Sequence, residues 1–276
     1  MSVNRIFLLT VMSTIVLSLL ACSPAASPGS SPTQAPATME NVPPLATETQ
    51  IVSEAPTETA VPVPQTHACA NAYMPIVPGA TWNYKLTGPL PDTFTHTILS
   101  VDDSTFVEQD VFAAGVTRQG TWNCENGNLI ALDPPSGASA NVNTENNVSV
   151  DFETKDLSGV TIPATIHAGD TWSQALTLEG TQTINGTSFP ASNQLTSDCK
   201  AIGVESVTVE AGTFDAMRVE CQTKMNLSLS MGDAPIQNTL NLTGTNWYVE
   251  KVGLVKTLTT GLGFDSTTEL VSYSIP

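Results

Sequence analysis

The three histidines, His67, His96 and His167, are the residues best suited to acid–base or metal chemistry. They do not form an HExxH motif, and no two of them have the spacing that would place them on one face of a helix. The sequence therefore does not support a zinc hydrolase. His96 shares one face of an expected strand with Phe94 and Ile98, and an inward-facing, hydrogen-bonded histidine is commoner there than a catalytic one.

The acidic residues offer a second source of chemistry. Asp102 and Asp103, Asp151 with Glu153, and Asp156 could act as paired carboxylates or calcium ligands. They lack the glycine-spaced order of an EF-hand and are interpreted as solvated loop acids. The chain has no Walker loop, dinucleotide fingerprint or GxSxG elbow. A catalytic triad assembled from distant loops leaves no signature in residue order. We therefore predict no catalytic, metal or cofactor site, and a hydrolase is the least favoured alternative.

The five cysteines divide into one near the start and four farther along the chain. No CxxC pair indicates zinc, and an even count in an exported chain predicts two disulfides, for which three pairings exist. Cys199 and Cys221 lie nearly symmetrically about the turn candidate 210–213. Antiparallel partners lie within disulfide range, so these two are predicted to pair. Cys69 and Cys124 then pair by elimination.

The start of the chain predicts export. Arg5 precedes an apolar run over residues 6–20, and Ala21 and Cys22 follow this run. A short basic region, a compact apolar region and small residues at the cleavage site are typical of a secretory signal. The run is too short to span a membrane as an anchor. Leu19 to Cys22 resembles the lipobox of bacterial lipoproteins, which predicts cleavage before Cys22, lipidation of its thiol and stable membrane anchoring.

Composition divides the remainder into a stalk and a domain. Residues 23–66 are rich in Pro, Thr, Ser, Ala and Glu and contain no aromatic residue. Such a segment cannot bury enough apolar surface to fold, and its prolines favour an extended chain. The predicted organisation is therefore a signal peptide over 1–21, the lipidated Cys22 and a disordered stalk over 22–66, and one domain over 67–276.

The strongest structural signal in this domain runs from Met217 to Met231. Alternate positions are mainly apolar, and the positions between them are polar; the candidate apolar ligand face comprises Met217, Val219, Met225, Leu227, Leu229 and Met231. Period-two alternation of this length predicts a half-buried strand. At about 3.3 Å per residue it would reach on the order of 50 Å, so it must bend. A large, curved antiparallel sheet of half-barrel form, mainly β with few or no helices, is the predicted fold.

A weak repeat suggests that the sheet has two related halves. Residues 79–82, Gly-Ala-Thr-Trp, recur at 169–172 as Gly-Asp-Thr-Trp, each before an alternating segment. The tryptophans are interpreted as buried anchors at strand starts, with ligand-stacking platforms as the alternative.

Two motifs in the second half of the domain resemble a pattern of uncharacterised bacterial envelope lipoproteins. They are the VTVEAGTF segment, residues 207–214, and the WYVEKVGLVK segment, residues 247–256. The resemblance implies an outline similar to the LolA and LolB lipoprotein carriers, whose curved antiparallel sheets hold acyl chains against an apolar concave face. Those carriers cover that face with helices, for which this sequence shows no pattern. Glu210 also replaces the proline usual at its position.

These observations limit the function to a few classes. Loss of the signal peptide removes only Arg5 from the nine basic residues, so the mature charge is 8 − 26 = −18. This charge disfavours nucleic acid as a partner and electrostatic attraction to anionic lipid. The favoured prediction is a membrane-tethered protein of the cell envelope, facing outside the cytoplasm, that binds an apolar ligand or an envelope protein without catalysis. The alternative is a structural, assembly or surface-display lipoprotein without a small ligand.

Overall fold

The computed structural model describes residues 68–133, 141–144, 148–231, 235–261, 263 and 265–276. The predicted signal peptide, Cys22, the stalk and His67 lie outside the described residues. The described chain consists of strands and their connections, and no helix in it is long and apolar enough to cross a membrane. The strands are β1 (Thr81–Thr87), β2 (Asp92–Val101), β3 (Thr105–Phe112), β4 (Val116–Glu125), β5 (Asn128–Ala131), β6 (Asn141–Thr144), β7 (Val148–Gly159), β8 (Thr171–Ile184), β9 (Thr187–Val209), β10 (Gly212–Ser230), β11 (Pro235–Val249), β12 (Gly253–Thr260) and β13 (Ser266–Ser274).

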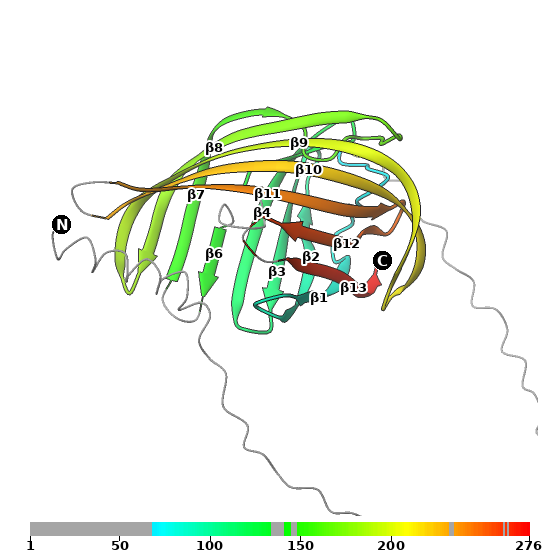
Figure 1. Cartoon of the computed structure of the whole chain (residues 1–276), viewed down its shortest axis with the longest axis horizontal. Coiled ribbons are helices and arrows are strands. Elements are labelled where there is room, and N and C mark those ends of the chain that lie inside the picture. Colours follow the sequence, from blue (N-terminus) through cyan, green and yellow to red (C-terminus); the bar gives the residue numbers. More distant parts are fainter. Residues whose placement is uncertain (1–67, 134–140, 145–147, 232–234, 262, 264) are drawn as a thin grey trace, which may run out of the picture. The chain divides into compact units, whose positions relative to one another are not determined.

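The described strands form one antiparallel sheet that closes on itself (Figure 1). The order is β3-β2-β1-β13-β12-β11-β10-β9-β8-β7-β6-β4-β5, and β3 also pairs with β4. One edge of β4 pairs with β3, while its other edge pairs with β6 over one half and β5 over the other. Twelve of the described strands thus form a closed barrel, from which β5 branches. The prediction of a mainly β, curved antiparallel sheet is confirmed, and the curvature continues to full closure.

The barrel has walls of unequal height. Strands β7 to β11, which we call the long wall, have 12, 14, 23, 19 and 15 residues. Strands β1 to β3, β12 and β13 have only 7 to 10. The long strands arch across the molecule in Figure 1. The expected bending occurs partly where the register of β9 and β10 shifts between Arg218 and Val219.

The weak sequence repeat corresponds to two equivalent hydrogen-bonded turns. Gly79 and Gly169 both have positive φ values, 81° and 94°. The Gly79 amide donates to the Ile98 carbonyl on β2, and the Gly169 amide donates to the Ala201 carbonyl on β9. In each case the residue after the glycine accepts a bond back from that same strand. The repeat therefore begins two similar hairpins, β1–β2 and β8–β9.

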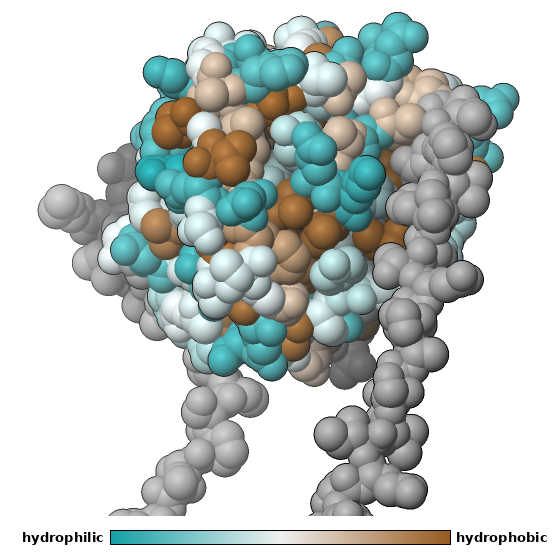
Figure 2. Space-filling view, turned by 90° about the vertical axis from the view of Figure 1, so that its right-hand side faces the viewer, coloured by the Kyte–Doolittle hydropathy of each residue, from teal (hydrophilic) through white to brown (hydrophobic). Residues whose placement is uncertain are grey.

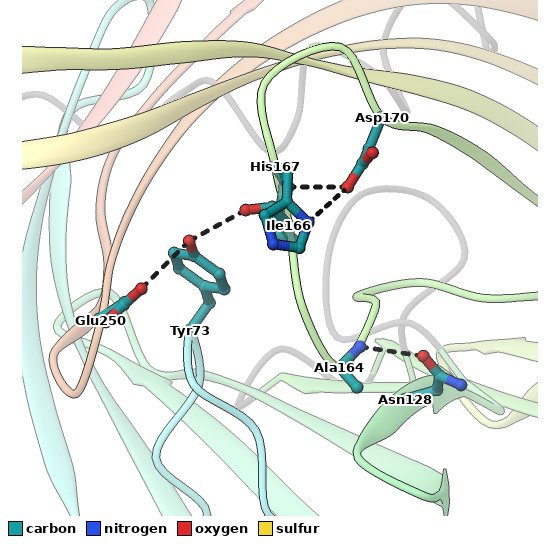
Figure 3. A network of polar contacts seen from close by, with 7 residues as sticks. All are labelled: Tyr73, Asn128, Ala164, Ile166, His167, Asp170 and Glu250. Atoms are coloured by element: carbon teal, nitrogen blue, oxygen red, sulfur yellow. Dashed lines mark hydrogen bonds and ion pairs between the residues drawn. The ribbon is translucent and has the colours of Figure 1, made fainter.

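Residues 68–80, the N-terminal cover, close one end of the barrel. The Ala68 amide donates to Asp103, the Gly127 amide donates to Ala68, and the Lys251 amide donates to Ala72. These partners belong to three separate hairpin turns at the same end. Figure 3 shows a further link: the Tyr73 hydroxyl lies between the Ile166 carbonyl, at 3.2 Å, and Glu250, at 3.5 Å. The cover contributes buried residues to the core and fixes its closed end.

Apolar side chains form two clusters inside the barrel. The larger one fills the covered end and includes Trp82, Phe106, Trp122 and Val219. The smaller one lies on the long wall and comprises Phe152, Leu176 and Leu178, with Val150, Ala191 and Leu195 packed against it. Several polar side chains are also buried in the protein, among them Glu108, Asp110, Gln174 and Asn193. Buried polar side chains require partners, and this draws attention to the interior as a functional site.

Candidate functional site

The predicted apolar face of β10 points into the barrel, but its two halves differ in burial. Val219 and Met225 are 1% and 3% exposed, and Met217 is also buried. Leu227, Leu229 and Met231 are only half-buried. They follow Met225 at intervals of two residues and therefore lie on the same face. The first half of the predicted face is packed core, and the second half is apolar surface that the barrel leaves partly exposed.

Neighbouring strands extend this partly exposed surface. In the sheet register, Leu229 lies between Ala191 of β9 and Ile236 of β11. Leu227 lies between Asn193 and Asn238 in the same way. Ala191 and Ile236 are half-buried as well. These residues form the end of the long wall that lies away from the N-terminal cover.

The other side of the interior carries a buried charged cluster built by β2, β3 and β4. His96 Nδ1 lies 2.8 Å from Asp110 Oδ1, and His96 Nε2 lies 3.4 Å from Glu108 Oε2. Glu108 is 1% exposed and the His96 side chain 14%. The register explains the assembly, since Asp110 is paired with His96 on one side and with Arg118 on the other. Glu108 lies opposite Gly120, which has no side chain.

Burial and neighbouring charges govern the ionisation of this cluster. Burial raises the pKa of Glu108 to about 7, against the opposing effect of His96. Burial lowers the pKa of His96, but Glu108 and Asp110 outweigh it and the net pKa is raised. The indole N–H of Trp122 also favours the charged form of Glu108, although it makes no hydrogen bond of regular geometry. The cluster is therefore proton-binding near neutral pH.

The geometry of the cluster does not resemble a nucleophilic triad. Both ring nitrogens of His96 face carboxylates, so neither is directed at a hydroxyl or thiol nucleophile. No group of three or more His, Cys, Asp or Glu among the described residues is arranged to hold a metal ion. Within that part of the chain, the cluster can store charge and protons and can pair with a polar group.

The remaining predicted residues are placed as follows. Disulfides join Cys199 to Cys221 across β9 and β10, and Cys69 to Cys124 between the N-terminal cover and β4; these are the predicted pairings. His167 is exposed, and its Nδ1 lies 3.3 Å from Asp170 (Figure 3). Trp82 and Trp172 occupy strand starts, and their indole nitrogens donate to the carbonyls of Val252 and Thr161.

Sequence reasoning placed His96 on an inward face but missed Glu108, Asp110 and Arg118. A signal was present in residues 106–112, where Phe106, Glu108, Asp110 and Phe112 alternate with Val107, Gln109 and Val111. The two acids lie on the same strand face as Phe106 and Phe112, one phenylalanine on either side of them. Acids on an apolar strand face indicate a buried polar site.

The outer surface offers weaker candidates. On the face seen in Figure 2, hydrophobic residues are interspersed with hydrophilic ones. An open groove of about 560 Å³ is lined mainly by outward residues of β7 to β10, among them Asp151, Glu153 and Glu179. Lys155 pairs with Glu153 at 2.8 Å, and both are exposed. These are solvated charges, as expected for Asp151 and Glu153, and no buried polar group accompanies them.

Residues 115–275, more than half of the chain, match the DUF3108-like family, and the chain belongs to that family. No curated protein sequence matches the chain significantly.

Two solved structures resemble the fold. A protein from Parabacteroides distasonis, provisionally described as a lipoprotein, is 18% identical with a TM-score of 0.50; the match covers 74% of this chain and 99% of the other. A protein from Bacteroides fragilis, provisionally described as exported and of YmcC-like fold, is 15% identical with a TM-score of 0.48; the match covers 74% and 100%. None of these matches names the LolA or LolB carriers, so that finer resemblance stays a prediction.

Proposed function

We propose that this chain is a lipoprotein of the cell envelope, anchored to a membrane through lipid on Cys22. In this proposal residues 1–21 are a signal peptide and residues 22–66 form a stalk that holds the barrel away from the membrane. The barrel faces outside the cytoplasm and binds an apolar or envelope ligand without catalysing a reaction. The ligand contacts the half-buried part of the β10 face, which comprises Leu227, Leu229 and Met231.

One observation carries the binding proposal: the inner apolar face of β10 continues beyond the packed core. Inner apolar side chains of a monomeric barrel are expected to be covered, because burial contributes about 25 cal/mol per Å². Here Leu227 and Leu229 are only half-buried, although their side chains lie on the same inward face of β10 as the buried Met225. Partly exposed apolar surface on a concave wall is typical of a site that a ligand completes.

The test is native mass spectrometry of the chain from Ser23 onward, exported by an unrelated signal sequence from a lipid-rich host. This chain lacks the acylated cysteine, so any lipid detected is bound non-covalently. We expect a co-purifying apolar mass that is lost in Leu227→Glu. Leu227 is preferred to Met225 because a glutamate at the buried Met225 would unfold the core.

The matched control is Ser228→Glu, one residue farther along β10 and on the opposite face. It adds the same charge to the same strand and should retain the ligand. If the wild-type chain is folded and ligand-free, or if both variants lose the ligand equally, the binding proposal is wrong. An assembly or display function would then be the better explanation.

A further inference from the structure

The Arg118 side chain lies partly buried on the inner face of β4, and the described residues offer it no ion-pair partner. It lies 4.7 Å above the ring of Phe112. Its Nε is buried and donates no hydrogen bond, and no carboxylate of the described residues lies within 4.0 Å of its nitrogens. Burial lowers the pKa of Arg118, against the opposing effect of the Asp110 charge, and guanidinium groups remain charged in proteins. A buried charge without a partner costs free energy, so such groups are normally paired.

The nearest acid does not satisfy this cation. Asp110 is the register partner of Arg118, but its Oδ1 is 2.8 Å from His96. Glu108 faces His96 as well. When His96 and Glu108 are both protonated, the charges of His96 and Arg118 face the single carboxylate of Asp110. The local surplus is therefore positive, in a chain whose formal net charge is −17.

Arg118 also lies at the junction between the charged cluster and the apolar long wall. Arg118 is paired across the sheet with Val142 of β6. The same row of cross-strand partners continues with Val150 of β7, Gln182 of β8 and Phe189 of β9. The next row on the same face, two residues farther along β7, consists of the successive partners Phe152, Gly180, Ala191 and Leu229. Val150 and Phe189 are half-buried, like Leu229. One sheet surface thus carries Arg118, without an ion pair among the described residues, at one side, and half-buried apolar side chains that continue across β7 to β10.

We propose that the barrel binds an anionic amphiphile, with its carboxylate or phosphate headgroup on Arg118 and its alkyl chain along the half-buried apolar side chains that lead from Val150 toward Leu229. This inference rests on the proposed apolar binding and adds the chemistry of the headgroup. Arg118 supplies the planar donors that recognise carboxylate and phosphate. The acidic remainder of the chain repels small free anions, so the apolar contacts are needed to hold the ligand.

The test is titration calorimetry with the chain from Ser23 onward and three probes. Laurate and dodecanol have the same number of carbons but differ in headgroup charge, and inorganic phosphate lacks the alkyl chain. Below micelle-forming concentrations, we expect laurate to bind at least about tenfold more tightly than dodecanol, because a hydrogen bond to a charged group is involved. Phosphate alone should not bind measurably.

The variant Arg118→Gln separates the headgroup contact from the fold. It should lose about tenfold or more in laurate affinity and leave dodecanol affinity unchanged, which also shows that the variant is folded. Arg118→Lys, which keeps the charge, should retain part of the preference for laurate.

The outcomes distinguish the two proposals. Equal affinities for laurate and dodecanol, or an Arg118→Gln variant that still prefers laurate, would overturn the headgroup assignment and leave apolar binding intact. Binding of phosphate alone as tight as that of laurate would show a simple anion site and also overturn the assignment. No binding of either twelve-carbon probe would overturn both proposals.

Discussion

His96 and Asp110 face each other across the β2–β3 pair with 2.8 Å between Nδ1 and Oδ1, and this contact closes a buried charged cluster inside the barrel. The second ring nitrogen of His96 faces Glu108. Two carboxylates therefore share one imidazole in a region shielded from water. The stability of the barrel should depend on the protons that this cluster holds.

We predict that the free energy of unfolding falls as the pH rises from about 5 to 8. The folded pKa of Glu108 is about 7, above its ordinary value of 4.5, so the folded state binds more protons in that interval. This contribution is present below pH 4.5 and lost by about pH 7, and it is on the order of 3 kcal/mol. The raised pKa of His96 acts in the same direction, with stability present below about 6.5 and lost above the folded pKa.

Thermal unfolding followed by circular dichroism across this pH range tests the prediction. Glu108→Gln should flatten the pH dependence, and Glu210→Gln, on the exposed β9–β10 turn, should not. The charges of His96, Asp110 and Asp133 act on Glu108, and the Trp122 indole acts on it as a hydrogen-bond donor. Arg118 of β4 and Tyr84 of β1 interact with Asp110. An unchanged slope in Glu108→Gln would contradict the assignment.

The two disulfides should contribute unequally to stability. Cys199 and Cys221 are 22 residues apart, and Cys69 and Cys124 are 55 apart. In the chain-entropy model, loss of the first costs about 3 kcal/mol and loss of the second about 4 kcal/mol. Denaturant unfolding of the two double alanine variants measures both values. Non-reducing peptide mapping of the wild type checks the pairing, and a Cys199–Cys124 peptide would refute it.

Gly180 should be required for the pairing of β7 with β8. A Cβ at this position would lie 1.9 Å from the Asp151 carbonyl oxygen, which is backbone and cannot move away cheaply. Gly180→Ala is expected to destabilise the protein by more than about 2 kcal/mol. Gly244→Ala is the matched control, since a Cβ there meets only Asn246 Nδ2 at 3.8 Å. Equal unfolding midpoints for the two variants would show that the long wall accommodates the added methyl group at position 180.

Lipidation at Cys22 stays a prediction that the described residues do not test. Metabolic labelling with a palmitate analogue should mark the wild-type chain and fail to mark Cys22→Ala. The change removes the only thiol at the predicted cleavage site and leaves both disulfides intact. If both proteins take up equal label, the anchor is elsewhere or absent.

Much of the fold could be read from periodicity. Alternation from Met217 to Met231 predicted a long, bent strand and identified its inward face, because side chains in a strand alternate strictly between two faces. The symmetric positions of Cys199 and Cys221 about the turn predicted their pairing for the same reason. The repeated glycine and tryptophan at 79–82 and 169–172 suggested two related halves, and the structure shows two equivalent hairpin starts within one closed sheet. Local spacing is sufficient for these features, since each depends on one strand or on one turn.

Closure of the barrel and assembly of its charged cluster required the tertiary structure. Alternation showed which face of β2 carries His96, but not that β3 lies beside it with Glu108 and Asp110 in register. Arg118 reaches the same site because β4 pairs with β3 on one edge and with β6 on the other. Pairings between distant segments depend on how the whole sheet curves, and a period of two contains no information on them. Burial of the cluster, and hence its shifted pKa values, follows only from that closure.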